Sequence, residues 1–168
     1  MKLAVIYDSK TGNTKQAAEW IAAGMERAEG IEARCFHIDE IDEAFVREAI
    51  GAVIGCPVYA ASMTAAMRGW LQTSAGKLDL AGKLGGAFAT QQYTHGGAEL
   101  AMQGILTIEM VQGMLCYSGG ASWGRPVIHI GPVAVNGNAE PHNGMEFYKD
   151  TFMIYGERFA KKAAELFG

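Results

Sequence analysis

Short, unbroken runs of apolar and small residues constrain the fold of this chain more than any other feature. They cover residues 3–7, 52–56, 84–90 and 115–117. Runs of this length and composition are typical of strands that are buried on both faces of a parallel sheet. A weaker run at 31–38, in which apolar residues alternate poorly, supplies one further strand.

Segments with helical periodicity separate these runs. We expect helices over residues 14–30, 43–49, 64–74, 98–114 and 146–167. Strand and helix therefore alternate about five times, which predicts an α/β fold with a doubly wound, five-stranded parallel sheet and helices on both faces. The length of 168 residues fits one domain, so we expect a single domain over 1–168.

The pattern is less regular after residue 117. The apolar stretch 127–130 is a candidate continuation or extension of the fifth strand, and residues 118–126 form an insertion rich in Gly, Ser and Trp. Residues 131–144 are rich in Gly and Asn, and we expect them to form a surface loop.

Charge and cysteine content exclude several classes of function. Lys and Arg number 14 and Asp and Glu number 18, so the net charge is −4 and no basic stripe supports nucleic-acid binding. No apolar stretch is long enough to span a membrane, and the N-terminus does not resemble a signal peptide, so we expect a cytoplasmic protein. The three cysteines and four histidines show no disulfide or metal-ligand spacing, and we predict no metal site.

The loop after the first strand is rich in hydrogen-bonding groups. Ser9, Thr11 and Thr14 offer hydroxyls and Asn13 offers an amide, immediately before a helix begins. The loop lacks the glycine pattern of dinucleotide-binding proteins and the Lys-Ser/Thr motif of NTPases. Ligands of such folds bind at the carboxyl ends of the strands, where a helix N-terminus attracts phosphate. The alternative is that one of these residues only caps the helix.

Residues 6–14 resemble the phosphate loop of flavodoxins and their relatives. The resemblance implies a flavodoxin-like fold with strand order 2-1-3-4-5 and an FMN cofactor. It also implies that the FMN phosphate is held largely without a salt bridge, so that Lys10 and Lys15 are peripheral. The residues implied to hold that phosphate are Ser9, Thr11, Gly12, Asn13 and Thr14.

The loop after the third strand, residues 55–64, offers an aromatic face. Pro57 is expected to end the strand, and a flat heterocycle could stack on Tyr59. We interpret Cys56 as a buried hydrophobe rather than a nucleophile, because no arginine stands six residues later. The stretch resembles the loop that wraps the isoalloxazine ring in the same flavoproteins, which implies a flavin contact for Pro57, Val58, Tyr59 and Ala60. By the same resemblance, Trp70 belongs to the core.

The loop after the fourth strand resembles the flavin loop of NAD(P)H:quinone oxidoreductases of the tryptophan-repressor-binding (WrbA) type, which carry a similar His-Gly-Gly-x-Glu motif at 95–99. The resemblance implies that His95, the candidate catalytic residue, lies near the ring edge or the substrate. The alternative for His95 is a loop histidine bonded to main chain or water. Gln side chains can meet both donors and acceptors of a flavin. The residues implied to line the pyrimidine side are Thr90, Gln91, Gln92, Tyr93 and Gly97.

Two departures from those oxidoreductases leave the oligomer and the substrate pocket open. The segment between the second and third strands is short, whereas the family carries extra structure there that helps to assemble a tetramer. Residues 118–144 do not match either. Trp123 in that insertion either covers a flavin, of this chain or of a partner, or fills a hydrophobic gap.

The sequence predicts an FMN-dependent oxidoreductase that passes electrons from NAD(P)H to a quinone or similar small acceptor. The alternative is a flavodoxin-type electron carrier without a substrate of its own, whose partner is a redox protein. A non-enzymatic binding module is disfavoured by the intact phosphate loop. Residues 55–64 and 90–98 contain no Asp or Glu, which favours the enzyme, because flavodoxins are acidic around the flavin. A homo-oligomer is compatible with either function.

Overall fold

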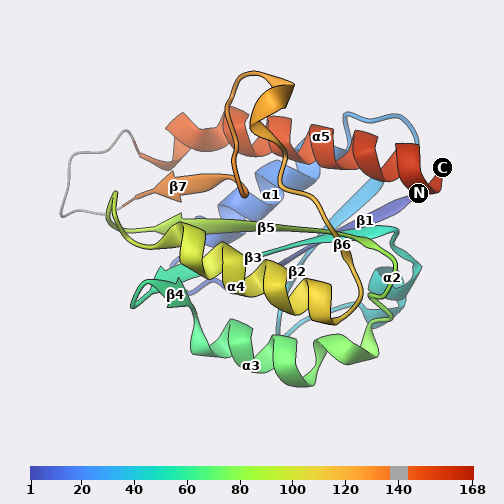
Figure 1. Ribbon diagram of the computed structural model, residues 1–168, viewed down its shortest axis with the longest axis horizontal. Helices are drawn as coiled ribbons and strands as arrows, with labels where there is room; N and C mark the ends of the chain where they lie inside the picture. Colours follow the sequence, from blue (N-terminus) through green and yellow to red (C-terminus); the bar gives the residue numbers. More distant parts are fainter. Residues whose placement is uncertain (137–143) are drawn as a thin grey trace.

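The computed structural model describes residues 1–136 and 144–168, which form a parallel sheet with helices on both faces (Figure 1). The predicted α/β class is therefore confirmed. The remainder of the predicted loop, residues 137–143 with His142, lies outside the described residues. No helix in the described ranges is both long and apolar enough to cross a membrane.

The sheet has the strand order β2-β1-β3-β5-β6, as predicted for a flavodoxin-like fold. Its inner strands are β1 (Lys2–Tyr7), β3 (Gly51–Tyr59) and β5 (Leu84–Gln91), and β2 (Glu32–His37) forms one edge. Neighbouring strands along this order are parallel. Every residue of β5 is buried, as expected for a strand covered on both faces.

The fifth position of the sheet is shared by two short strands. β6 (Leu115–Cys116) pairs with the start of β5, and β7 (Val133–Val135) pairs with its end. The prediction that 127–130 continues the strand was wrong, because no strand lies between Cys116 and Val133, and this segment includes the 3-10 helix η2 (Ala121–Trp123). β7 was missed because three residues within a Gly- and Asn-rich segment show no periodicity.

Pro57 does not end the third strand, which corrects the sequence prediction. β3 continues to Tyr59 and turns through Ala60 and Ala61 into the short antiparallel strand β4 (Ser62–Met63). The neighbouring strand β1 pairs no further along β3 than Gly55, so Pro57 has a parallel partner on one side only, where β5 lies. A missing N–H is tolerated at such an edge position.

Two layers of helices bury the sheet. α1 (Asn13–Met25) and α5 (Lys149–Phe167) cover one face, and Figure 1 shows them above the sheet. α2 (Glu43–Glu48), α3 (Ala65–Thr73) and α4 (Ala98–Val111) cover the other. The 3-10 helices η1 (Ala75–Lys77) and η3 (Met145–Tyr148) follow α3 and precede α5.

Glycines allow α1 and α5 to pack backbone against backbone. A Cβ atom on Gly24 of α1 would lie 2.0 Å from the carbonyl oxygen of Met153, and one on Gly156 of α5 would lie 2.1 Å from that of Ile21. Contacts this short with main-chain atoms cannot be relieved by a rotamer change. The two helices must therefore separate if either glycine gains a side chain.

A carboxyl group is buried beneath the edge of the sheet. Glu109 of α4 is 0% exposed, its Oε1 atom has no hydrogen-bond partner within the described chain, and the Cys116 thiol lies 3.7 Å from Oε2. Burial raises the pKa of Glu109 well above its ordinary value. The carboxyl group of Glu109 therefore keeps its proton to a higher pH in the folded protein than in the unfolded chain.

We predict that Gly24→Ala lowers the free energy of unfolding by about 1–3 kcal/mol through overpacking of α1 against α5. Gly69→Ala in α3 is the matched control, because a Cβ there would meet nothing within 4 Å. It should raise stability by about 0.5–1 kcal/mol through helix propensity alone. Urea denaturation measures both, and equal effects of the two substitutions would contradict the close packing.

We predict that Glu109→Gln becomes more stabilising relative to the wild type as pH rises from about 4 to 7. A raised folded-state pKa means that the unfolded chain releases its proton first, so wild-type stability falls with rising pH in this window. The amide cannot ionise and removes that fall. Urea denaturation across the pH range tests this, with Glu99→Gln on the exposed side of α4 as control. A stability difference independent of pH would refute it.

Candidate functional site

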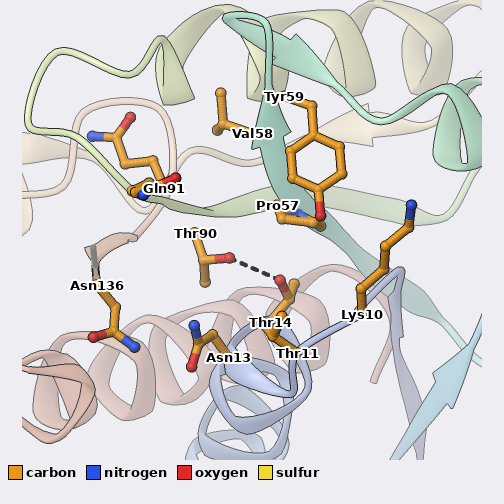
Figure 2. Close-up of a pocket in the computed structure, with 11 residues that line it drawn as sticks. Lys10, Thr11, Asn13, Thr14, Pro57, Val58, Tyr59, Thr90, Gln91 and Asn136 are labelled. Atoms are coloured by element: carbon orange, nitrogen blue, oxygen red, sulfur yellow. Dashed lines mark hydrogen bonds between the residues drawn. The ribbon is translucent and has the colours of Figure 1, made fainter. Parts of the chain in front are cut away.

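A cavity of about 400 Å³ opens at the carboxyl ends of β1, β3 and β5. This is the point where the strand order reverses and where ligands bind in doubly wound sheets. Figure 2 shows side chains from the three strand ends directed toward it. Its lining comprises Lys10, Thr11, Asn13, Thr14, Pro57, Val58, Tyr59, Thr90, Gln91, Gln92 and Asn136.

The start of α1 leaves main-chain N–H groups without partners. Gly12 occupies the N-cap position with φ of 94° and, as a glycine, supplies no capping side chain of its own. Ser9 Oγ accepts hydrogen bonds from the N–H groups of Gly12 at 3.2 Å and Lys15 at 3.3 Å. Within the described chain, the N–H groups of Asn13 and Thr14 meet no acceptor. Of the three residues proposed as helix caps, only Ser9 caps α1, and the side chains of Asn13 and Thr14 do not. The N–H groups of Asn13 and Thr14 remain available to bind an anion.

A hydroxyl pair joins the helix start to the sheet. Thr14 Oγ1 lies 2.8 Å from Thr90 Oγ1, and both residues are buried (Figure 2). Either hydroxyl can donate in this pair. The bond holds the first turn of α1 against the end of β5.

The buried carboxylate of Asp8 ties together three strand ends. Its Oδ2 atom accepts a 2.5 Å hydrogen bond from Thr64 Oγ1, which in turn accepts from the N–H of Met67 and caps α3. His37 Nε2 at the end of β2 lies 3.8 Å from Oδ1 of Asp8. This network fixes the residue from which the predicted phosphate loop departs.

A second crevice continues from the cavity between the β3–β4 turn and the loop before α4. Val58, Tyr59, Gln91 and Gln92 line both spaces, so the two are contiguous. Tyr59 and Tyr93 are each 46% exposed, which leaves their rings accessible to a ligand. The residues that line the crevice but not the cavity are Ala60, Ala61, Tyr93, His95 and Gly96.

The loop before α4 is held in place by Gln91. Its Nε2 donates to the carbonyl of Thr94 at 3.2 Å, and its Oε1 accepts from the N–H of Ala98 at 3.1 Å. One of its two amide donors and its acceptor oxygen are therefore used by the loop itself. Gln92, whose side chain is exposed, retains the freedom to meet a ligand.

Most of the sequence-predicted residues meet at these two spaces, but Ser9, Gly12 and Gly97 do not line them. Ser9 and Gly12 lie on the opposite side of the loop, beside His37. Gly97 has φ of 94°, and a Cβ there would lie 2.7 Å from Ala61, so the glycine lets α4 approach the β3–β4 turn. Asn136 was missed, because nothing in a Gly- and Asn-rich segment distinguishes one asparagine from another.

Three other candidates lie outside the cavity lining. Trp123 is 60% exposed, and Lys162 of α5 lies over its ring, so it does not cover the site of its own chain. Trp70 is buried in the core, as expected. Cys56 is completely buried, and burial raises the pKa of its thiol to about 12, which fits a hydrophobic role rather than a nucleophilic one.

In the part of the chain that the structure describes, no carboxylate lines either space. Lys10 is the only lysine or arginine among the described residues that lines them, and His95 lies exposed at the rim of the crevice. Among the described residues no group of three or more His, Cys, Asp or Glu side chains could hold a metal. The arrangement offers an anion site at one end and aromatic surfaces at the other.

Comparison with known proteins identifies relatives along nearly the whole chain. A flavodoxin of Clostridium saccharobutylicum is 37% identical over 99% of this chain and 100% of its own length. One of Aquifex aeolicus is 33% identical over 97% of this chain and 87% of its own. An NAD(P)H dehydrogenase (quinone) of Chromohalobacter salexigens is 26% identical over 67% of this chain and 68% of its own.

Solved structures share the fold at low identity. A WrbA-like flavodoxin from Agrobacterium tumefaciens matches with a TM-score of 0.76 and 23% identity, covering 98% of each chain. The flavodoxin of Fusobacterium nucleatum, solved with bound flavin mononucleotide, matches with a TM-score of 0.67 and 13% identity over 99% of each chain.

The names of the two more similar relatives favour the electron-carrier alternative over the quinone oxidoreductase. The sequence model of the flavodoxin family itself matches residues 5–103, more than half of the chain. With this match and a relative that is 37% identical over the full length, the chain belongs to the flavodoxin family.

Proposed function

We propose that this chain binds FMN in the cavity and crevice described above and carries electrons between redox proteins. The observation that carries the proposal is the start of α1, where unpartnered N–H groups and threonine hydroxyls adjoin an aromatic crevice. Membership of the flavodoxin family and the FMN-bound structure of a fold relative support it. Bound FMN would supply the redox chemistry, since its ring accepts and returns electrons.

The start of α1 would hold the phosphate. The N–H groups of Asn13 and Thr14 meet no acceptor within the described chain, and the hydroxyl of Thr11 lines the same cavity. The positive end of the helix dipole adds to their attraction for a dianion. The hydroxyl of Thr14 can donate to the phosphate while it accepts from Thr90. Ser9 and Gly12 would act indirectly, by shaping the loop.

The tyrosines of the crevice would hold the ring. Tyr59 ends β3 and Tyr93 follows β5, so a flat heterocycle entering the crevice meets aromatic surface from both loops. Aromatic stacking contributes about 0.5–1.5 kcal/mol beyond area burial. Pro57, Val58 and Thr90 line the adjoining cavity, and they would shield that side of the ring from water.

A quinone oxidoreductase that takes electrons from NAD(P)H remains the second candidate function. The described residues that line the site include no carboxylate, which favours this function, because an acidic rim is the usual means of attracting basic redox proteins. His95, exposed at the crevice, would donate a hydrogen bond to the acceptor in such an enzyme. The relative named as a quinone dehydrogenase supports it less than the two flavodoxins support a carrier.

We predict that Thr11→Ala combined with Thr14→Ala weakens FMN binding at least 100-fold. Each substitution would remove one hydrogen bond from a hydroxyl to the charged phosphate, and such a bond contributes roughly 1.5–3 kcal/mol to binding. Fluorescence titration of the apoprotein with FMN measures the effect. Thr107→Ala is the control, because that hydroxyl lies on the exposed side of α4 and bonds only to the carbonyl of Gln103. An unchanged affinity in the double variant would refute the phosphate assignment.

We predict that NADH and NADPH leave the flavin of the holoprotein oxidised in an anaerobic cuvette, while dithionite bleaches it. A carrier has no site for nicotinamide over its flavin and receives electrons from another protein. The absorbance near 450 nm, followed for several minutes, decides between the two candidates. Rapid bleaching by either nucleotide would overturn the carrier and establish the oxidoreductase.

A further inference from the structure

The site that we propose for FMN has an unusual charge pattern. Among residues 1–136 and 144–168, no carboxylate lines the cavity or the crevice, and the ammonium group of Lys10 is the one permanent charge on their walls. Asp8, although close in sequence, turns its carboxylate toward Thr64 and His37 instead. The charge of Lys10 would therefore act on a ligand that gains or loses charge in this site, and no carboxylate of the described lining residues would offset it.

Lys10 is placed against the ring of Tyr59. Its Nζ atom lies over that ring, 5.6 Å from the centroid, which is within the range of a cation–π contact. In the view of Figure 2, the Tyr59 ring lies between Lys10 on one side and Thr90 and Gln91 on the other. Lys10 is exposed, and no carboxylate of the described residues lies within 4.0 Å of its Nζ.

We propose that Lys10 is a positioning residue that holds the Tyr59 ring against bound FMN and raises the reduction potential of that FMN. The proposal rests on the proposed function. Oxidised FMN that takes up two electrons and one proton gains one negative charge on its ring at neutral pH. The Lys10 ammonium behind the adjoining aromatic ring stabilises that added charge, and no carboxylate of the described residues lines the cavity or the crevice to oppose it.

The phosphate cannot produce the same effect. Its charge is the same in oxidised and reduced FMN, so any attraction between Lys10 and the phosphate cancels when the affinities of the two forms are compared. The ratio of these affinities, measured as the two-electron midpoint potential, therefore isolates the action of Lys10 on the ring.

The test is an anaerobic dithionite titration of the holoprotein against a reference dye, with wild type and Lys10→Gln compared. We expect Lys10→Gln to lower the ratio of the affinities for reduced and oxidised FMN by about three- to tenfold. At 29.6 mV per tenfold, this lowers the midpoint potential by about 14–30 mV. Lys10→Arg, which keeps both the charge and the stacking on Tyr59, should restore the wild-type potential. The shift should shrink in 1 M salt, because exposed charges are screened.

Lys15→Gln is the matched control. Lys15 lies close by in the first turn of α1, but its Nζ lies 4.0 Å from the carboxylate of Glu19, and it does not line the cavity. Its removal should leave the midpoint unchanged. An equal shift in both variants, or no shift in Lys10→Gln, would overturn the role of Lys10. A wild-type chain that does not bind FMN at all would instead overturn the proposed function, so the two failures are distinguishable.

Discussion

The parallel pairing of β1, β3 and β5 is the constraint on which the rest of this structure depends. It brings the ends of three strands, separated by tens of residues in the chain, to one edge of the sheet. The register of β3 and β5 places Pro57 opposite Thr90, and Thr90 in turn holds the first turn of α1 through Thr14. The site is therefore a consequence of strand register rather than of any one loop.

The loops at this edge are shaped by backbone conformations that favour glycine. Gly12 and Gly97 both adopt positive φ values immediately before a helix, which turns the chain sharply from strand to helix. Ala60 and Ala61 adopt positive φ values of 50° and 55° without being glycines. Such conformations cost of order 1 kcal/mol or more each, and the short pairing of β3 with β4 and the close approach of Gly97 hold them.

Much of this fold could be predicted from the sequence, because periodicity reports burial. The helix at 98–114 and the buried strands follow from apolar patterns, whereas the strand order was implied only by the resemblance to flavodoxins. The hydroxyl-rich loop lines the main cavity, as expected of a binding loop at this edge. Glu109 could not be predicted, because a carboxylate in a helix normally lies in solvent, and only the tertiary structure shows that the edge of the sheet covers it. The role of Gln91 in bracing its own loop likewise depends on contacts that no local pattern encodes.

The open N–H groups at the start of α1 also make the protein without a ligand less stable. N–H groups of Asn13 and Thr14 that lack a protein acceptor contribute less to stability than capped ones would, by about 0.5–2 kcal/mol for a typical N-cap. A side chain that capped them would stabilise the apoprotein and compete with the ligand for the same donors. An anion bound there satisfies the donors and stabilises the folded state by mass action. The two open N–H groups thus couple the stability of the fold to occupancy of the site, and they explain why a loop so rich in capping residues caps its helix through Ser9 alone.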